Sequence, residues 1–102
     1  MPKSETFIIT RQELRKLLIT FQVREKNVEG LLNDMEKAHR HIDVIKFSDM
    51  LIKAGLSRGN LGNVLRRIGI DDLKIRNVLN NLDETKIMRE TGRLYNATIE
   101  YS

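Results

Sequence analysis

The sequence predicts an all-α domain in which two similar helical motifs, products of an internal duplication, share one core. Apolar residues recur five times at positions i, i+3, i+4 and i+7, a spacing that places them on one face of an α-helix. A shift of 47 positions also lays the apolar pattern of residues 9–35 on that of residues 56–82. Such self-similarity indicates a repeated unit whose apolar face needs a neighbour to cover it. We therefore expect a single domain, 1–102, made of motif 1 (8–55) and motif 2 (56–102).

Each apolar quartet predicts one helix. The expected helices cover residues 10–22, 27–38, 47–54, 57–68 and 71–83. Thr10 and Glu13 have the spacing of a capping box, in which each side chain accepts a hydrogen bond from a backbone N–H of the other residue. The expected N-caps of the later helices are Asn27, Ser48, Ser57 and Asp71. Gly55 and Gly69 can adopt the left-handed conformation that ends a helix.

The helical pattern is interrupted once in each motif. Residues 39–46 are polar at one end and β-branched at the other, so we expect a loop with an extended stretch at 42–45. The matching joint of motif 2 is 90–99. These two joints can pair as a short two-stranded ribbon between the motifs.

The composition is that of a globular protein, which we expect to be intracellular. Hydrophobic residues make up 40% of it and charged residues 31%, which is ordinary for such a domain and unlike a disordered chain. No apolar run is long enough to cross a bilayer, and the first residues lack the order of a signal peptide, so no membrane association is expected. The absence of cysteine excludes disulfides and thiol catalysis.

The formal charge of +4 invites a nucleic-acid interpretation, which the distribution of charge weakens. Motif 1 has nine Lys/Arg and seven Asp/Glu, and motif 2 has eight and six, so each carries +2 with both signs interspersed. Binding to a phosphate backbone rewards clustered positive charge. The pattern is therefore more typical of a solvated surface.

The sequence contains no recognisable catalytic, cofactor or metal site. His39 and His41 flank Arg40, which repels a cation, and no third ligand is fixed by spacing. Asp71 and Asp72 fall at a predicted helix N-terminus, where the helix dipole favours carboxylates. We therefore predict no enzymatic activity, no cofactor and no bound metal.

Apolar residues outside the predicted core mark a candidate partner surface. Ile19 and Ile52 lie far from the apolar stripe of their helices, and Leu73 has no apolar counterpart in motif 1. Phe7 and Tyr95 lie near the chain ends, where they can line the seam between the motifs or offer an edge to an extended peptide. We expect a protein-protein interaction module that binds a peptide or protein segment in the groove between the two motifs.

The alternative function is that of a helix-turn-helix DNA-binding protein with residues 57–68 as recognition helix. Gly55 fits the turn, and the helix would expose a polar set to DNA. This set is Arg58, Asn60, Asn63, Arg66 and Arg67. Against this alternative, Leu51 occupies a place usually held by a small residue, and Gly59 and Gly62 weaken the helix by about 1 kcal/mol each.

Two weakly similar segments, TFIITRQELRKLL and AGLSRGNLGNVLRRI, open the two motifs, and both are rich in Leu, Ile, Lys and Arg. Together with the length of 102 residues and the absence of cysteine, they resemble the small, internally duplicated proteins of Acidianus filamentous viruses. The resemblance implies a viral protein of a hyperthermophilic archaeal host that has no assigned enzymatic activity and acts through protein contacts in the host cytoplasm. The eight asparagines depart from it, because Asn is thermolabile.

Overall fold

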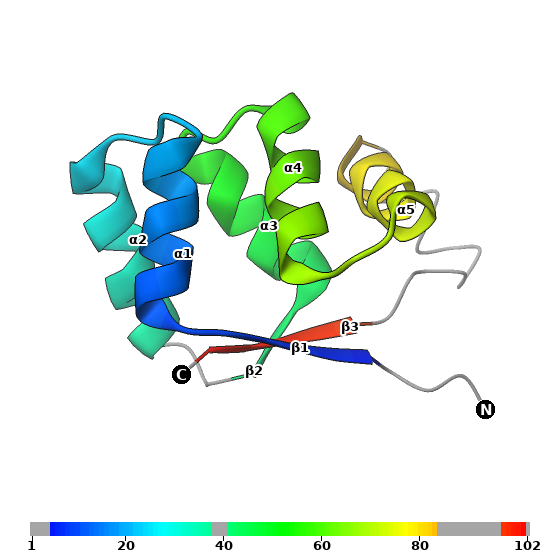
Figure 1. Ribbon diagram of the computed structural model, residues 1–102, viewed down its shortest axis with the longest axis horizontal. Helices are drawn as coiled ribbons and strands as arrows, with labels where there is room; N and C mark the ends of the chain where they lie inside the picture. Colours follow the sequence, from blue (N-terminus) through cyan, green and yellow to red (C-terminus); the bar gives the residue numbers. More distant parts are fainter. Residues whose placement is uncertain (1–4, 38–40, 84–96, 102) are drawn as a thin grey trace.

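The fold is mixed α and β, so the all-α prediction is wrong. The computed structural model describes residues 5–37, 41–83 and 97–101. For residues 81 and 83 it describes the backbone only. In chain order the described residues form β1 (Glu5–Ile9), α1 (Arg11–Thr20), α2 (Glu25–Lys37), β2 (His41–Asp43), α3 (Val44–Lys53), α4 (Arg58–Ile68), α5 (Asp72–Asp83) and β3 (Ala97–Tyr101). All five of these helices lie on one side of a sheet built from the three strands (Figure 1).

The last strand in the chain, β3, lies at the centre of the sheet. It runs parallel to β1, with Phe7 opposite Ile99, and antiparallel to β2, with Ile42 opposite the same residue. The antiparallel β2–β3 pair occupies the place expected for a two-stranded ribbon. The predicted two-stranded ribbon is nevertheless wrong, because β1 adds to the other edge of β3 and the pair is part of a three-stranded sheet.

The core lies between the sheet and the helices. Alternate residues of the strands point into it, as expected for a sheet with one covered face. These inward side chains are buried at Ile9, Ile42, Ala97, Ile99 and Tyr101. They join the helical residues Leu14, Leu18, Val28, Leu32, Phe47, Leu51, Leu61, Leu65 and Val78 in one apolar cluster.

The five predicted helices are confirmed in type, and most of their ends follow local hydrogen bonding. The capping box is present: Thr10 Oγ1 accepts from the Glu13 N–H at 3.1 Å, and Glu13 Oε1 accepts from the Thr10 N–H at 3.3 Å. Ser57 Oγ accepts from the Asn60 N–H at 3.3 Å, and Asp71 Oδ1 accepts from the Lys74 N–H at 3.0 Å. The predicted caps Ser57 and Asp71 are therefore confirmed.

Two predicted caps are wrong. The third helix begins at Val44 because Asp43 accepts hydrogen bonds from the N–H groups of Ile45 and Lys46. Ser48 lies inside that helix and is fully buried. The second helix begins at Glu25, which places Asn27 within its first turn instead of at its cap.

The turn between paired helices has the same geometry in both halves of the chain. α1 and α4 begin 47 residues apart, as do α2 and α5. After α1 the Val23 N–H donates to the Leu18 carbonyl at 2.9 Å, and after α4 the Ile70 N–H donates to the Leu65 carbonyl at 3.1 Å. The residue before each donor has a positive φ, 68° at Gln22 and 119° at Gly69. The local structure thus repeats at the same 47-residue spacing as the apolar pattern of the sequence. The division into motif 1 and motif 2 stays a prediction.

Tyr101 ends β3 with a buried hydroxyl group, for which the described residues provide no hydrogen-bond partner. Burial raises the pKa of its phenol, and the nearby positive charge of Arg11 partly opposes that rise. Burying a hydroxyl without a partner costs free energy, which the apolar contacts of the Tyr101 ring must outweigh.

We predict that Tyr101→Phe leaves the free energy of unfolding unchanged or raises it by up to about 1 kcal/mol, because the substitution removes an unpaired buried group. The raised pKa adds a second expectation. Tyr101 of the unfolded chain ionises first, so the wild type should lose stability relative to the variant as pH rises above about 10. Urea unfolding at pH 7 and at high pH measures both effects. A clear loss of stability at pH 7, or parallel pH profiles, would contradict them.

Candidate functional site

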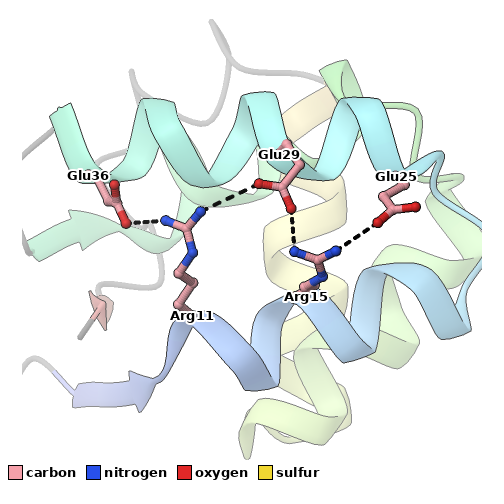
Figure 2. Close-up of polar contacts among 5 residues, drawn as sticks. All are labelled: Arg11, Arg15, Glu25, Glu29 and Glu36. Carbon is pink, nitrogen blue, oxygen red and sulfur yellow. Dashed lines mark hydrogen bonds and ion pairs between the residues drawn. The ribbon is translucent and has the colours of Figure 1, made fainter.

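A ladder of ion pairs joins α1 to α2 (Figure 2). Arg11 and Arg15 lie one turn apart on α1 and face three glutamates of α2. Arg11 bonds Glu36 and, at 3.5 Å, Glu29; Arg15 bonds Glu29 and, at 2.7 Å, Glu25. The bond to Glu36 raises the pKa of the Arg11 guanidinium. Both arginines are thus matched by carboxylates, and this face is not a basic patch.

A hollow of about 490 Å³ lies where the end of α1 approaches α4, and we call it the seam hollow. Phe21, the C-cap of α1, forms one wall. The other lining residues, Asn63, Arg66 and Arg67, come from α4. The guanidinium of Arg67 lies 5.7 Å from the centre of the Phe21 ring, within the range of a cation–π interaction. This hollow lies between the two predicted motifs and combines positive charge with an aromatic surface.

Most of the residues proposed for DNA binding are hydrogen-bonded within the chain. The bonds run from Arg58 to the Leu79 carbonyl (3.2 Å), from Asn60 to the Phe21 carbonyl (3.5 Å), from Asn63 to Asn60 Oδ1 (3.4 Å) and from Arg66 to Asp72 Oδ1 (2.8 Å). The described residues provide no ion pair for Arg67. The polar side of α4 is therefore tied to its neighbours α1 and α5.

The α3–α4 pair nevertheless has the helix order that the DNA-binding alternative requires. Residues 54–57 connect the two helices, and Gly55 has a φ of 106° in this turn. Leu51, which is large for a close helix crossing, is fully buried in the core. The turn fits a helix-turn-helix, while the crossing is filled by a leucine.

The structure separates the residues proposed for peptide binding. Ile19 and Leu73 are 46% and 74% exposed, whereas Ile52 is half-buried and packs against the core. Phe7 is half-buried, and its ring lies 3.6 Å from the position that a Cβ on Gly69 would take. Tyr95 lies outside the described residues.

Two surface residues were missed by the sequence patterns. Phe21 closes an apolar quartet, which predicts a core residue, yet its place at the end of α1 leaves it half-buried in the seam hollow. Ile8 is 65% exposed because it points away from the covered face of the sheet. The sequence does not indicate that Ile8 is exposed, because Phe7, Ile8 and Ile9 are all apolar and show no alternation with polar residues.

The part of the chain that the structure describes contains no group of three or more His, Asp or Glu side chains arranged to hold a metal ion. His41 is an exposed residue of β2, and its Nε2 lies 3.7 Å from Glu100 Oε1. None of the described helices is both long enough and apolar enough to span a membrane.

We predict that Glu29→Gln lowers the thermal unfolding midpoint, because it removes the carboxylate that both Arg11 and Arg15 share. The difference from wild type should shrink toward zero in about 1 M NaCl, where charges are screened over about 3 Å. Asp34→Asn, an equal change of charge on the same helix, is the control. A deficit that persists in high salt would show that packing, and not the ion pairs, explains the effect.

The comparisons with known proteins give no relative: no protein family, no curated protein and no solved structure matches this chain.

Proposed function

We propose that the chain is a non-enzymatic protein-protein interaction module that binds an acidic peptide segment of a partner in the seam hollow. The observation that carries this proposal is the lining of the hollow by two arginines, an asparagine and a phenylalanine at the junction of α1 and α4. The resemblance to Acidianus filamentous virus proteins agrees with this role, because it implies action through protein contacts inside a host cell.

The lining defines the chemistry of the partner. Guanidinium groups bind carboxylates through paired, charge-assisted hydrogen bonds, and arginine clusters commonly recognise acidic motifs. The Asn63 amide can donate to or accept from a peptide backbone. The Phe21 ring adds an apolar surface for a neighbouring side chain. A segment with a carboxylate next to an apolar residue fits all of these groups.

The ion pair between Arg66 and Asp72 does not prevent such binding. Their side chains are 58% and 77% exposed, and an exposed pair of this kind contributes little to stability. A carboxylate of the partner can therefore replace Asp72. Arg67 already lies over Phe21 and is held in place before the partner arrives.

DNA binding through α4 is the less favoured alternative. A recognition helix contacts base edges with its N-terminal residues. In α4 those residues are Arg58 and Asn60, and their side chains are directed to the Leu79 and Phe21 carbonyls. Binding of DNA would break these contacts, whereas a peptide in the seam hollow leaves them intact.

An array of short peptides that vary in acidic and apolar content, probed with the full chain, tests the proposal. We expect binding to peptides that combine the two, and we expect Arg67→Gln to weaken it about tenfold, the loss typical of an important interface residue. Arg24→Gln is the matched control, because Arg24 is exposed in the turn after α1 and the change of charge is the same.

Mixed-sequence duplex DNA serves as the competing ligand. A DNA complex should lose affinity by orders of magnitude between about 50 and 200 mM salt, because bound counterions are released. If the chain binds DNA in this way and no peptide, or if Arg24→Gln weakens peptide binding as much as Arg67→Gln, the seam hollow is not a peptide site.

A further inference from the structure

A second hollow, of about 340 Å³, lies between α2 and α3, and we call it the α2–α3 groove. Leu31, Met50 and Ala54 provide its apolar surface. Polar residues surround them: Lys26, Asn27, Asp34 and Lys53. The groove is separate from the seam hollow and shares no lining residue with it.

Gly30 lies in the middle of α2 and lines this groove without a structural need for glycine. Its φ is not positive, and a Cβ built on it meets nothing within 4 Å. Glycine weakens a helix interior relative to alanine. Neither backbone conformation nor lack of space therefore requires glycine at position 30, and the absent side chain leaves room for another chain to approach the helix closely.

Leu73 is the most exposed large apolar residue of the described chain, at 74%. It lies in the first turn of α5. α2 and α5 occupy opposite ends of the molecule along its 37 Å axis (Figure 1), so Leu73 cannot reach the groove of its own chain. A protruding leucine and an open apolar groove at opposite ends are complementary surfaces for two different copies.

We propose that Leu73 of one copy docks in the α2–α3 groove of a second copy. The charges along the two surfaces are also complementary when the helices are read from N- to C-terminus. Along one face of α2 the groove presents Lys26, Gly30 and Asp34. The exposed side of α5 presents Asp72, Leu73 and Arg76. With Leu73 over Gly30 and the two helices parallel, Asp72 lies toward Lys26 and Arg76 lies toward Asp34. These pairs of opposite charge fix the orientation of the contact.

Because the two surfaces differ, the contact is heterologous. Repeated docking produces a ring or an open chain of copies. The contact is small, so we expect association that depends on concentration and that is weak beside an obligate dimer. Asp72 also bonds Arg66 of the seam hollow, and for this reason the tests below leave it unchanged.

Sedimentation velocity of the full chain over a concentration series tests the proposal. Leu73→Gln removes the apolar side chain, and Gly30→Gln fills the groove, both without a change of charge. Each should raise the concentration of half-association about tenfold or more, since the contact depends on burying one leucine. An equimolar mixture of the two variants should form a 1:1 dimer that grows no further, because one retains the groove and the other retains Leu73.

Matched variants separate this contact from general effects of the substitutions. Ile8→Gln changes another exposed apolar residue, and Gly59→Gln fills another open helical glycine; both should associate like wild type. Gly30→Gln should also raise the thermal midpoint of the dilute, monomeric chain, so its loss of association cannot come from unfolding. A wild type that stays monomeric up to about 1 mM, or a variant mixture that forms no dimer, would overturn the proposal.

Discussion

The pairing of β3 with β1 on one side and β2 on the other is the constraint on which the fold depends. It sets Phe7, Ile99 and Ile42 in one row across the sheet, although they come from three distant segments. α3 packs against β2 and β3, and α4 packs against β1, so the helices rest on a surface that β3 completes. Without β3, β1 and β2 would be isolated strands with unpaired backbone groups, which are not stable in water.

On this sheet the two helix pairs use the same turn but are held together differently. In α1–α2, Arg15 reaches across to Glu25 and Glu29. The position 47 residues later is Gly62, which is buried, and a Cβ there would lie 3.6 Å from Ile75 Cγ2. At this position the first pair is therefore joined by charges and the second by close apolar packing, while Arg66 and Asp72 form an ion pair elsewhere between α4 and α5.

The features predicted correctly from sequence are local ones. Helix periodicity, the Thr10–Glu13 capping box and the left-handed Gly69 depend on residues a few positions apart. The sheet depends on pairing between the two ends of the chain, and neither five-residue segment specifies its partner. Asn63, Arg66 and Arg67 were recognised as candidates because polar residues on a helix face are visible in sequence. Phe21 was missed as the wall of their hollow, since its spacing is that of a core residue and its exposure follows from how α1 meets α4.

Native-state hydrogen exchange of the full chain tests the role of β3 most directly. If β3 completes the fold, its backbone amides open only when the whole domain unfolds. Their exchange should then give the same free energy, and the same dependence on denaturant, as the amides of Leu61 and Leu65 in α4. Rapid exchange of β3 amides, with α4 amides still protected, would show that the helices hold together without the sheet and would contradict the account.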